Sequence, residues 1–352
     1  MSVKLKPLAE QTIVITGATS GIGLTTACRA AARGAKVVLV ARNEDALREI
    51  RDGILARGGR ADYVVADVGD KEDMIRVGAE AERHFGRFDT WVNNAGIGVY
   101  AKLEELSDED HERLFRTNYW GVVYGSRVAL QALKRHGGAL INMGSIASEM
   151  PSPMLGAYTA TKHAVKGFTD SLRLELLHEG APVSVTLIQP SGIDTPFGEH
   201  ARNYMDEASQ VPPPVYAPEV VADAILHAAE HPTRNLVVGG VGRAMIAASR
   251  VVPSLADRLF AWSFFKTARQ AGRPPRDTPK NLHQPGEDGS RHGDQGHQFG
   301  SSLYTAARMH PAATLGALAA GAALVGMIAS GRVQPANAAH RLQRALEHDR
   351  AA

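Results

Sequence analysis

The amino-acid sequence predicts an α/β fold built on a doubly wound parallel sheet of about seven strands, with helices on both faces and a helical C-terminal extension. Two observations lead to this prediction. From residue 11 to about residue 240, short runs rich in β-branched residues alternate with longer amphipathic stretches, which is the order of consecutive β-α-β units. Most of the short runs are also apolar on both faces, as expected of parallel strands that helices cover above and below.

The segments with the composition of buried strands define a main domain over residues 8–240. The helical stretches between them, such as Glu44 to Arg57 and Asp108 to Lys134, carry apolar residues at helical spacing. A chain of 352 residues is long enough for this domain and a further segment. The predicted strands are residues 12–16, 36–41, 61–67, 88–94, 138–145, 183–190 and 235–240.

The chain changes character after the last predicted strand. Residues 241–270 predict one or two helices, and residues 271–310, which are rich in Gly, Pro, Asp, Gln and His, predict a flexible linker. An Ala- and Gly-rich hydrophobic helix over residues 311–332 and a polar tail over residues 333–352 follow. Residues 312–331 carry no charge and have the length to cross a bilayer, but few of them are strongly apolar. Two alternatives therefore stay open: a membrane anchor, or a helix packed on protein.

The composition excludes several classes of protein. The 39 basic and 37 acidic residues give a net charge of +2, so there is no electrostatic footprint for nucleic acid. The single cysteine, Cys28, rules out a disulfide framework and a multi-cysteine zinc site, and we expect no metal. The N-terminus lacks the apolar run of a secretory signal. We therefore expect a cytoplasmic protein, whose association with a membrane depends on the C-terminal segment.

A glycine-rich turn, TGATSGIG at residues 16–23, directly follows the first predicted strand and opens the first predicted helix. A phosphate bound there needs a tight turn, close approach of the backbone and free N–H groups at a helix start, all of which this pattern supplies. Between a strand and a helix, the pattern indicates a Rossmann-type fold with a dinucleotide site. We assign to that site Gly17, Thr19, Ser20, Gly21, Ile22 and Gly23.

The end of the second predicted strand distinguishes between the two nicotinamide dinucleotides. A carboxylate there would accept the ribose hydroxyls of adenosine, whereas a cation would bind the 2′-phosphate of NADP(H). The strand ends at Arg42 without an acid, so we predict that NADP(H) is preferred over NAD(H), although arginine is also common on a surface. Asp67 and Val68, after the third strand, are placed to reach the adenine; alternatively, Asp67 caps the helix that begins near Asp70.

Tyr158 and Lys162 lie four residues apart and therefore share one face of a predicted helix. An ammonium group near a phenol favours the phenolate and lowers the phenol pKa towards the range of a general base. Ser145 and Asn94 end two strands at the edge where the ligand crevice of such a sheet opens, and the Ser145 hydroxyl is placed to bind a reacting oxygen. Asn118 lies in the middle of a predicted helix, where asparagine is disfavoured, so we expect its side chain to have a polar role.

With these motifs the sequence resembles the short-chain dehydrogenase/reductase family over roughly residues 8–240. The resemblance implies that Tyr158 is the catalytic acid/base, that Lys162 lowers its pKa and holds the nicotinamide ribose, and that Ser145 fixes the reacting oxygen. The backbone near Asn118 would hold a water that links Lys162 to solvent. The matching features are TGATSGIG, NNAG at 93–96, Asn118, Ser145, YTATK at 158–162 and the segment PSGIDT at 190–195.

The family also implies which residues contact the dinucleotide. Gly17, Ser20, Ile22 and Asn94 match cofactor-binding positions, and Ile193 and Thr195 match positions that meet the carboxamide and the phosphate. The chain departs from the family at residues 190–192, where Pro-Ser-Gly stands in place of the usual Pro-Gly. This departure puts the contacts of the loop that follows in doubt.

The resemblance implies reversible hydride transfer between NADP(H) and an alcohol or carbonyl carbon. The segment from Pro196 to Pro218 is a candidate lid with apolar and aromatic side chains, so we expect a small hydrophobic alcohol or ketone as substrate. The family implies a homodimer or homotetramer. The alternative from another class is a non-catalytic NADP(H)-binding regulatory or scaffold protein, recruited through its C-terminal tail. The intact set of Ser145, Tyr158 and Lys162 argues against that alternative.

Overall fold

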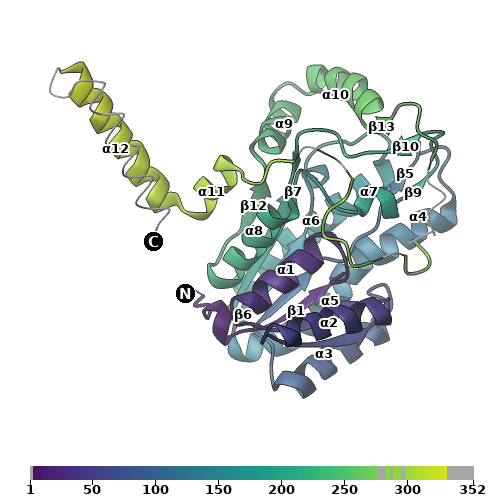
Figure 1. Cartoon of the computed structure of the whole chain (residues 1–352), viewed down its shortest axis with the longest axis vertical. Helices are drawn as coiled ribbons and strands as arrows, with labels where there is room; N and C mark the ends of the chain where they lie inside the picture. The colour runs from purple at the N-terminus through teal and green to yellow at the C-terminus, as the bar shows by residue number, and fades with distance from the viewer. Residues whose placement is uncertain (1–2, 276–281, 287, 295, 297, 331–352) are drawn as a thin grey trace. The chain divides into compact units, whose positions relative to one another are not determined.

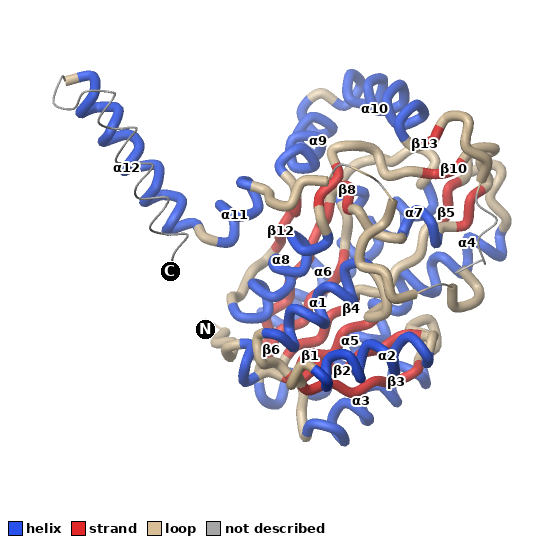
Figure 2. Tube along the Cα trace, in the orientation of Figure 1, coloured by secondary structure: helices blue, strands red, loops and turns tan. Residues whose placement is uncertain are grey.

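Seven parallel strands form one central sheet in the order β12-β7-β6-β4-β1-β2-β3 (Figure 1; Figure 2). The computed structural model that shows this describes residues 3–275, 282–286, 288–294, 296 and 298–330. The sheet confirms the predicted doubly wound, Rossmann-type α/β fold. Its strands are β1 (Thr12–Thr16), β2 (Lys36–Ala41), β3 (Arg60–Val65), β4 (Thr90–Asn93), β6 (Gly138–Met143), β7 (Val183–Pro190) and β12 (Asn235–Val238).

Helices cover both faces of this sheet. On one face α1 and α8 pack against each other, in front of the strands in Figure 1. On the other face α3, α5 and α6 bury apolar side chains such as Met74, Leu133 and Leu176 against Val14, Val38 and other strand residues. The helices are α1 (Gly21–Ala32), α2 (Glu44–Ala56), α3 (Lys71–Phe85), α4 (Asp108–Phe115), α5 (Gly121–His136), α6 (Gly156–His178) and α8 (Pro218–Glu230).

The register of the central strands decides where the sequence motifs meet. Ile15 of β1 lies beside Val92 of β4, Val92 lies beside Ile141 of β6, and all of these strands are parallel. Their carboxyl ends therefore lie at one edge of the sheet. The glycine-rich turn after β1, the NNAG segment after β4 and Ser145 after β6 come together there, although up to about 130 residues of sequence separate them.

The predicted helical extension after residue 240 is present as α9 (Gly240–Val251) and α10 (Pro253–Thr267). Pro253 separates the two helices because its ring fits the first turn of α10 but could not continue α9. Along α10, Ala256, Phe260 and Phe264 form one buried stripe, which packs with Ile246 of α9 and with Met150 of the main domain. The extension is thus joined to the main domain by an apolar contact.

The described part of residues 271–310 differs from the expected linker because it makes specific contacts with the main domain. Leu282 is 1% exposed. The Phe299 N–H donates to the carbonyl of Val215 at 2.9 Å, and the Phe299 carbonyl accepts from the N–H of Ala217 at 3.0 Å. Residues 1–305 accordingly form one compact unit. Composition did not reveal these contacts, because most of them use backbone groups that every residue carries.

A second unit begins at Ala306, of which residues 306–330 are described. Its described part contains most of α11 (Leu303–Met309) and all of α12 (Pro311–Ala329). Among the described residues, no helix combines the length and the apolar character needed to cross a membrane. The predicted polar tail, residues 333–352, lies outside the described residues.

Candidate active site

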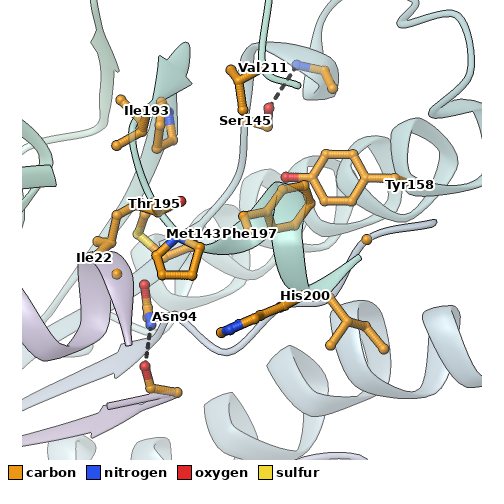
Figure 3. Close-up of a pocket in the computed structure, with 18 of the residues that line it drawn as sticks. Ile22, Asn94, Met143, Ser145, Tyr158, Ile193, Thr195, Phe197, His200 and Val211 are labelled. Atoms are coloured by element: carbon orange, nitrogen blue, oxygen red, sulfur yellow. Dashed lines mark hydrogen bonds between the residues drawn. The ribbon is translucent and has the colours of Figure 1, made fainter. Parts of the chain in front are cut away.

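A cavity of about 420 Å³ opens at the carboxyl edge of the sheet (Figure 3). Every residue that the sequence assigned to the dinucleotide lines it, and so do Ser145, Tyr158 and Lys162. Asn118 does not line the cavity but lies behind it. The dinucleotide residues brought together are Gly17, Thr19, Ser20, Gly21, Ile22, Gly23, Arg42, Asp67, Val68, Asn94, Ile193 and Thr195.

The glycine-rich turn is locked against the end of β4. Gly17 has a φ of +64°, and a Cβ atom on Gly23 would lie 1.9 Å from the carbonyl oxygen of Gly17. The Asn94 side chain closes the turn from the other side, because its Nδ2 donates to the carbonyls of Thr16 at 2.9 Å and Gly17 at 3.1 Å. Glycine is therefore needed here for the shape of the turn itself, and that shape leaves the start of α1 facing the cavity.

Arg42 and Asp67 line the far end of the cavity, and Arg113 contacts Asp67. Nη2 of Arg113 donates to Oδ2 of Asp67 at 2.6 Å, and the N–H of Gly69 donates to Oδ1 at 2.9 Å. Burial alone would raise the pKa of Asp67, but these hydrogen bonds prevail and lower it. Asp70, and not Asp67, caps α3, so the capping alternative for Asp67 is wrong. Arg113 was missed by sequence reasoning, since it lies on α4 with no motif around it.

Asn118 is wholly buried in a π-helical turn, Arg116–Trp120, that joins α4 to α5. Its Oδ1 accepts from the N–H of Ile97 at 2.9 Å, and its Nδ2 donates to the Ile97 carbonyl at 3.0 Å and to Oγ1 of Thr161 at 3.2 Å. Asn118 thereby ties the segment after β4 to α6, the helix that carries Tyr158. This explains an asparagine inside a helix, and π turns are frequent at functional sites.

Ser145, Tyr158 and Lys162 meet at the other end of the cavity, as predicted from their spacing. Ser145 is near enough to Tyr158 to act on the pKa of its phenol, and both side chains line the cavity (Figure 3). Oγ of Ser145 also accepts from the N–H of Ala147 at 3.1 Å, which fixes its rotamer. Nζ of Lys162 donates to the carbonyl of Met143 at 2.8 Å and lies 5.5 Å from the centre of the Tyr158 ring.

Burial dominates the protonation of this pair. It raises the pKa of Tyr158 to about 12, although the hydrogen bond with Ser145 acts in the opposite direction. It also lowers the pKa of Lys162 to about 8. The expected lowering of the Tyr158 pKa by Lys162 is not found, because burial of the phenol dominates and Ser145 is the group that acts against it. At neutral pH Tyr158 is a protonated phenol beside a cationic Lys162.

The substrate end of the cavity is closed by two parts of the chain. Phe197 of α7 (Phe197–His200), in the predicted lid, packs edge-on against the Tyr158 ring with centroids 5.4 Å apart. Met245 of α9 and Phe264 of α10 line the cavity from the extension. Sequence reasoning proposed the lid but missed the extension, because nothing in the pattern of α9 and α10 distinguishes residues that face a ligand from residues that face the core.

The additional residue in the Pro190-Ser191-Gly192 segment is accommodated without displacing the loop from the cavity. Both the N–H and the hydroxyl of Ser191 donate to the carbonyl of Val238, at 3.0 and 2.8 Å. Ile193 follows in β8 (Gly192–Ile193), which pairs with β11 (Val215–Tyr216), and it still lines the cavity together with Thr195.

The dinucleotide end of the cavity is crossed by a segment from far along the chain. We call the described residues 282–286 and 288–294 the strap. Its residues Pro285, Gly286 and Asp288 line the cavity. The N–H of Gly21, at the start of α1, donates to the carbonyl of Ser290 at 2.9 Å. The Gly21 N–H, at a residue that the sequence assigned to the dinucleotide, is thus hydrogen-bonded to another part of the protein.

Comparison with known proteins agrees with this geometry. A family model described as short chain dehydrogenase matches residues 11–206. The chain is 46% identical over 280 residues to the uncharacterized oxidoreductase YxnA of Bacillus subtilis, with 78% of each chain covered. It is 35% identical over 193 residues to a 3beta-hydroxysteroid dehydrogenase of Mediterraneibacter gnavus, covering 54% of this chain and 69% of that protein.

Two solved structures resemble the fold closely. A short chain dehydrogenase/reductase of Burkholderia phymatum in complex with NAD has a TM-score of 0.65 and 25% identity, covering 71% of this chain and 96% of that one. An alcohol dehydrogenase of Thermococcus sibiricus complexed with 5-hydroxy-NADP has a TM-score of 0.57 and 28% identity, covering 64% of this chain and 95% of that one. Such neighbours therefore include complexes with each of the two dinucleotides.

Proposed function

The chain belongs to the short-chain dehydrogenase family of oxidoreductases, and on that premise we propose that it transfers hydride between NADP(H) and a hydrophobic alcohol or ketone. The observation that carries the proposal is the single cavity at the sheet edge. One end of it presents the glycine-rich turn and Arg42, and the other end presents Ser145, Tyr158 and Lys162. A dinucleotide-binding scaffold would have no need of a buried phenol next to a buried ammonium.

The preference for NADP(H) rests on the charge at the adenosine end. Arg42 and Arg113 both lie there, and the carboxylate of Asp67 is already paired with Arg113 at 2.6 Å. Arg42 itself lines the cavity, where a guanidinium suits a 2′-phosphate, which adds two negative charges to the ribose. The neighbour complexed with 5-hydroxy-NADP supports this choice, and the NAD complex marks the alternative.

The residues of the cavity fit a dinucleotide. The close packing at Gly17 and Gly23 leaves no room for a side chain, so the backbone at the start of α1 is open to a phosphate. Ile193 and Thr195 flank the same path on the β7 side. A nicotinamide bound there supplies or accepts the hydride.

We assign the movement of the proton to Tyr158. Because its pKa is raised to about 12, the phenol is protonated at neutral pH and is ready to give its proton to a carbonyl oxygen during reduction. Ser145, which lines the cavity with Tyr158, would hold that oxygen by a second hydrogen bond. Lys162 and Asn118 position the helix and the phenol, and Lys162 would also bind the nicotinamide ribose.

The substrate would be rigid and largely apolar. Phe197, Met245, Phe264 and the Pro212–Pro214 run line the cavity and suit an apolar substrate, while His200, Ser263 and Thr267 also line it and offer a polar contact to a hydroxyl or carbonyl group. Relatives named as hydroxysteroid dehydrogenases support a sterol-like alcohol or ketone. A homodimer or homotetramer formed through α6 and the turn before α5 is supported by the exposure of Trp120 in that turn and of Leu174 and Leu177 in α6, at 42, 62 and 69%.

The experiment is a screen of hydrophobic ketones, including ketosteroids, with NADPH oxidation followed at 340 nm. We expect turnover by the wild-type protein and a loss of about 10³-fold in Tyr158→Phe, with NADPH binding unchanged. Tyr63→Phe, at a tyrosine outside the cavity whose hydroxyl bonds Glu44, is the matched control and should keep full activity. Full activity in Tyr158→Phe would remove the proposed mechanism, and binding of neither dinucleotide would remove the proposed function.

A further inference from the structure

We propose that the strap competes with the dinucleotide for its binding groups, so that Asp288 and its neighbours set the affinity of the site and must lift when the cofactor binds. This inference rests on the proposed function and deepens it. It concerns residues that come more than 240 positions after the motif that they cover.

The first observation is the set of bonds between the strap and the glycine-rich turn. Besides the bond from Gly21 to Ser290, the N–H of Gly289 donates to the carbonyl of Thr19 at 2.8 Å. The hydroxyl of Thr19 donates to Oδ1 of Asp288 at 2.9 Å. The Gly21 N–H and the Thr19 hydroxyl are donors that a phosphate would use at this turn. A phosphate and the strap cannot occupy them together.

The second observation is at the adenosine end. The guanidinium of Arg42 donates to the carbonyls of Leu282 at 3.4 Å and Gln284 at 3.2 Å. Nδ2 of Asn43 donates to the carbonyl of Gly286 at 3.4 Å. The strap therefore covers the proposed 2′-phosphate site as well as the turn.

The charge of Asp288 makes the competition direct. Its carboxylate bonds Thr19 and also lies close enough to Arg42 to raise the pKa of that guanidinium, against the lowering by burial and by Arg113. The Asp288 carboxylate therefore already places a negative charge where the phosphates of the dinucleotide would place theirs. Two anions at one site repel each other, so binding of the cofactor favours departure of Asp288.

The strap is anchored on both sides of its central part, which allows the centre to lift. On one side Leu282 is buried with Val99, Leu114 and Ala157, and its carbonyl accepts from Nε of Arg113 at 2.8 Å. On the other side, past the strap, Phe299 makes two backbone bonds with β11 and its neighbour. The centre, by contrast, is held by polar contacts, which include those of His292 with Glu219 at 3.2 Å and of the Asp294 N–H with Glu199 at 3.0 Å. Such a segment can open without unfolding the domain.

The expected effect is a change in the apparent affinity for the dinucleotide. If the cofactor binds only molecules whose strap is lifted, the apparent Kd equals the intrinsic Kd divided by the lifted fraction. Loss of the Asp288 hydrogen bond and charge shifts that fraction upward. We expect Asp288→Ala to bind NADPH on the order of tenfold more tightly than the wild type. Asp288→Asn, which keeps an acceptor for Thr19 but loses the charge, should lie between the two.

The test is a titration of the full-length protein with NADPH, and with NADH, followed by nicotinamide fluorescence. Asp52→Ala, at an exposed aspartate of α2 outside the cavity, is the matched control and should bind like the wild type. Equal affinity of Asp288→Ala and wild type would overturn the competition, and weaker binding by Asp288→Ala would show that the strap holds the cofactor instead. If no variant binds either dinucleotide, the proposed function itself fails.

Hydrogen exchange supplies a readout that does not depend on the size of the affinity change. Saturating NADPH should increase amide exchange in peptides that cover residues 282–294, while it protects those that cover residues 17–23. Protection of both segments would contradict a strap that lifts. Exchange in residues 282–294 should also rise in Asp288→Ala without cofactor, and its failure to do so would show that Asp288 does not hold the strap.

Discussion

The carboxyl end of the central sheet and the chain after residue 240 line the same cavity, but they are specified in different ways. At the sheet edge, short motifs around Gly17, Ser145 and Tyr158 hold the chemistry, and their spacing in the sequence was enough to identify them. The later chain brings Phe264 and the strap by contacts between residues far apart, such as the 240 positions between Arg42 and Leu282. The comparison teaches that local motifs reveal the reaction, whereas access and affinity depend on long-range packing.

The largest effect should come from the sheet edge, in Gly23→Ala. The new Cβ would lie 1.9 Å from the carbonyl oxygen of Gly17, so the turn must open, at an expected loss of about 3 kcal/mol in the free energy of unfolding. Binding of NADPH should be lost with it. Thermal denaturation and dinucleotide titration measure both. Gly53→Ala, where the nearest atom is the end of the Arg57 side chain at 3.4 Å, should instead be neutral or stabilising.

A smaller effect is expected from Arg42→Ala, at the point where the two regions touch. Loss of the cation should weaken NADPH binding by roughly tenfold to a hundredfold, because the 2′-phosphate loses a charge-assisted hydrogen bond. NADH binding should stay unchanged or become slightly tighter, since the strap loses its bonds to Arg42. Arg57→Ala, an exposed arginine at the end of α2, is the control. Equal weakening of both dinucleotides would overturn the assignment of Arg42 to the 2′-phosphate.

The pH dependence should separate the two directions of the reaction. With the pKa of Tyr158 at about 12, the phenol stays protonated through neutral pH, so ketone reduction should hardly change between about pH 6 and 8. Alcohol oxidation needs the phenolate, whose fraction rises up to about tenfold per pH unit below the pKa. Rates of oxidation measured from about pH 6 to 8, below the pKa of about 8 of Lys162, should therefore climb. A plateau below pH 8 would show that the bound dinucleotide or Lys162 lowers the pKa far more than this structure indicates.

The smallest effect on the stability of the whole domain should come from Leu282→Ala, in the chain after residue 240. This side chain anchors the strap in a small apolar cluster with Val99 and Leu114. We expect faster amide exchange in residues 282–294, with exchange in β1 and β4 unchanged, because the strap adds little to the core of the sheet. Equal acceleration in the sheet would mean that the strap is part of the cooperative domain and does not open separately.

The sheet order, the glycine-rich turn and the meeting of Ser145, Tyr158 and Lys162 could be predicted because each rests on local pattern or on the rule that parallel strands end at one edge. Met245 and Asp288, which line the cavity, and Arg113, which bonds Asp67, could not be predicted, since each comes from a segment whose own sequence carries no motif. The pKa of Tyr158 could not be predicted from the sequence either. Its spacing from Lys162 indicated a lowered value, but the depth of burial, which only the fold determines, raises it.

The most direct test of the central claim is the transfer of label from NADPH that carries deuterium at the transferable C4 position. Products from a pool of hydrophobic ketones, including ketosteroids, would be examined by mass spectrometry for wild type and Tyr158→Phe. The account predicts one deuterium on the carbinol carbon with the wild type, and almost none with Tyr158→Phe, which should still bind NADPH. Products without deuterium, or equal labelling by Tyr158→Phe, would contradict the assignment of hydride and proton transfer to this cavity.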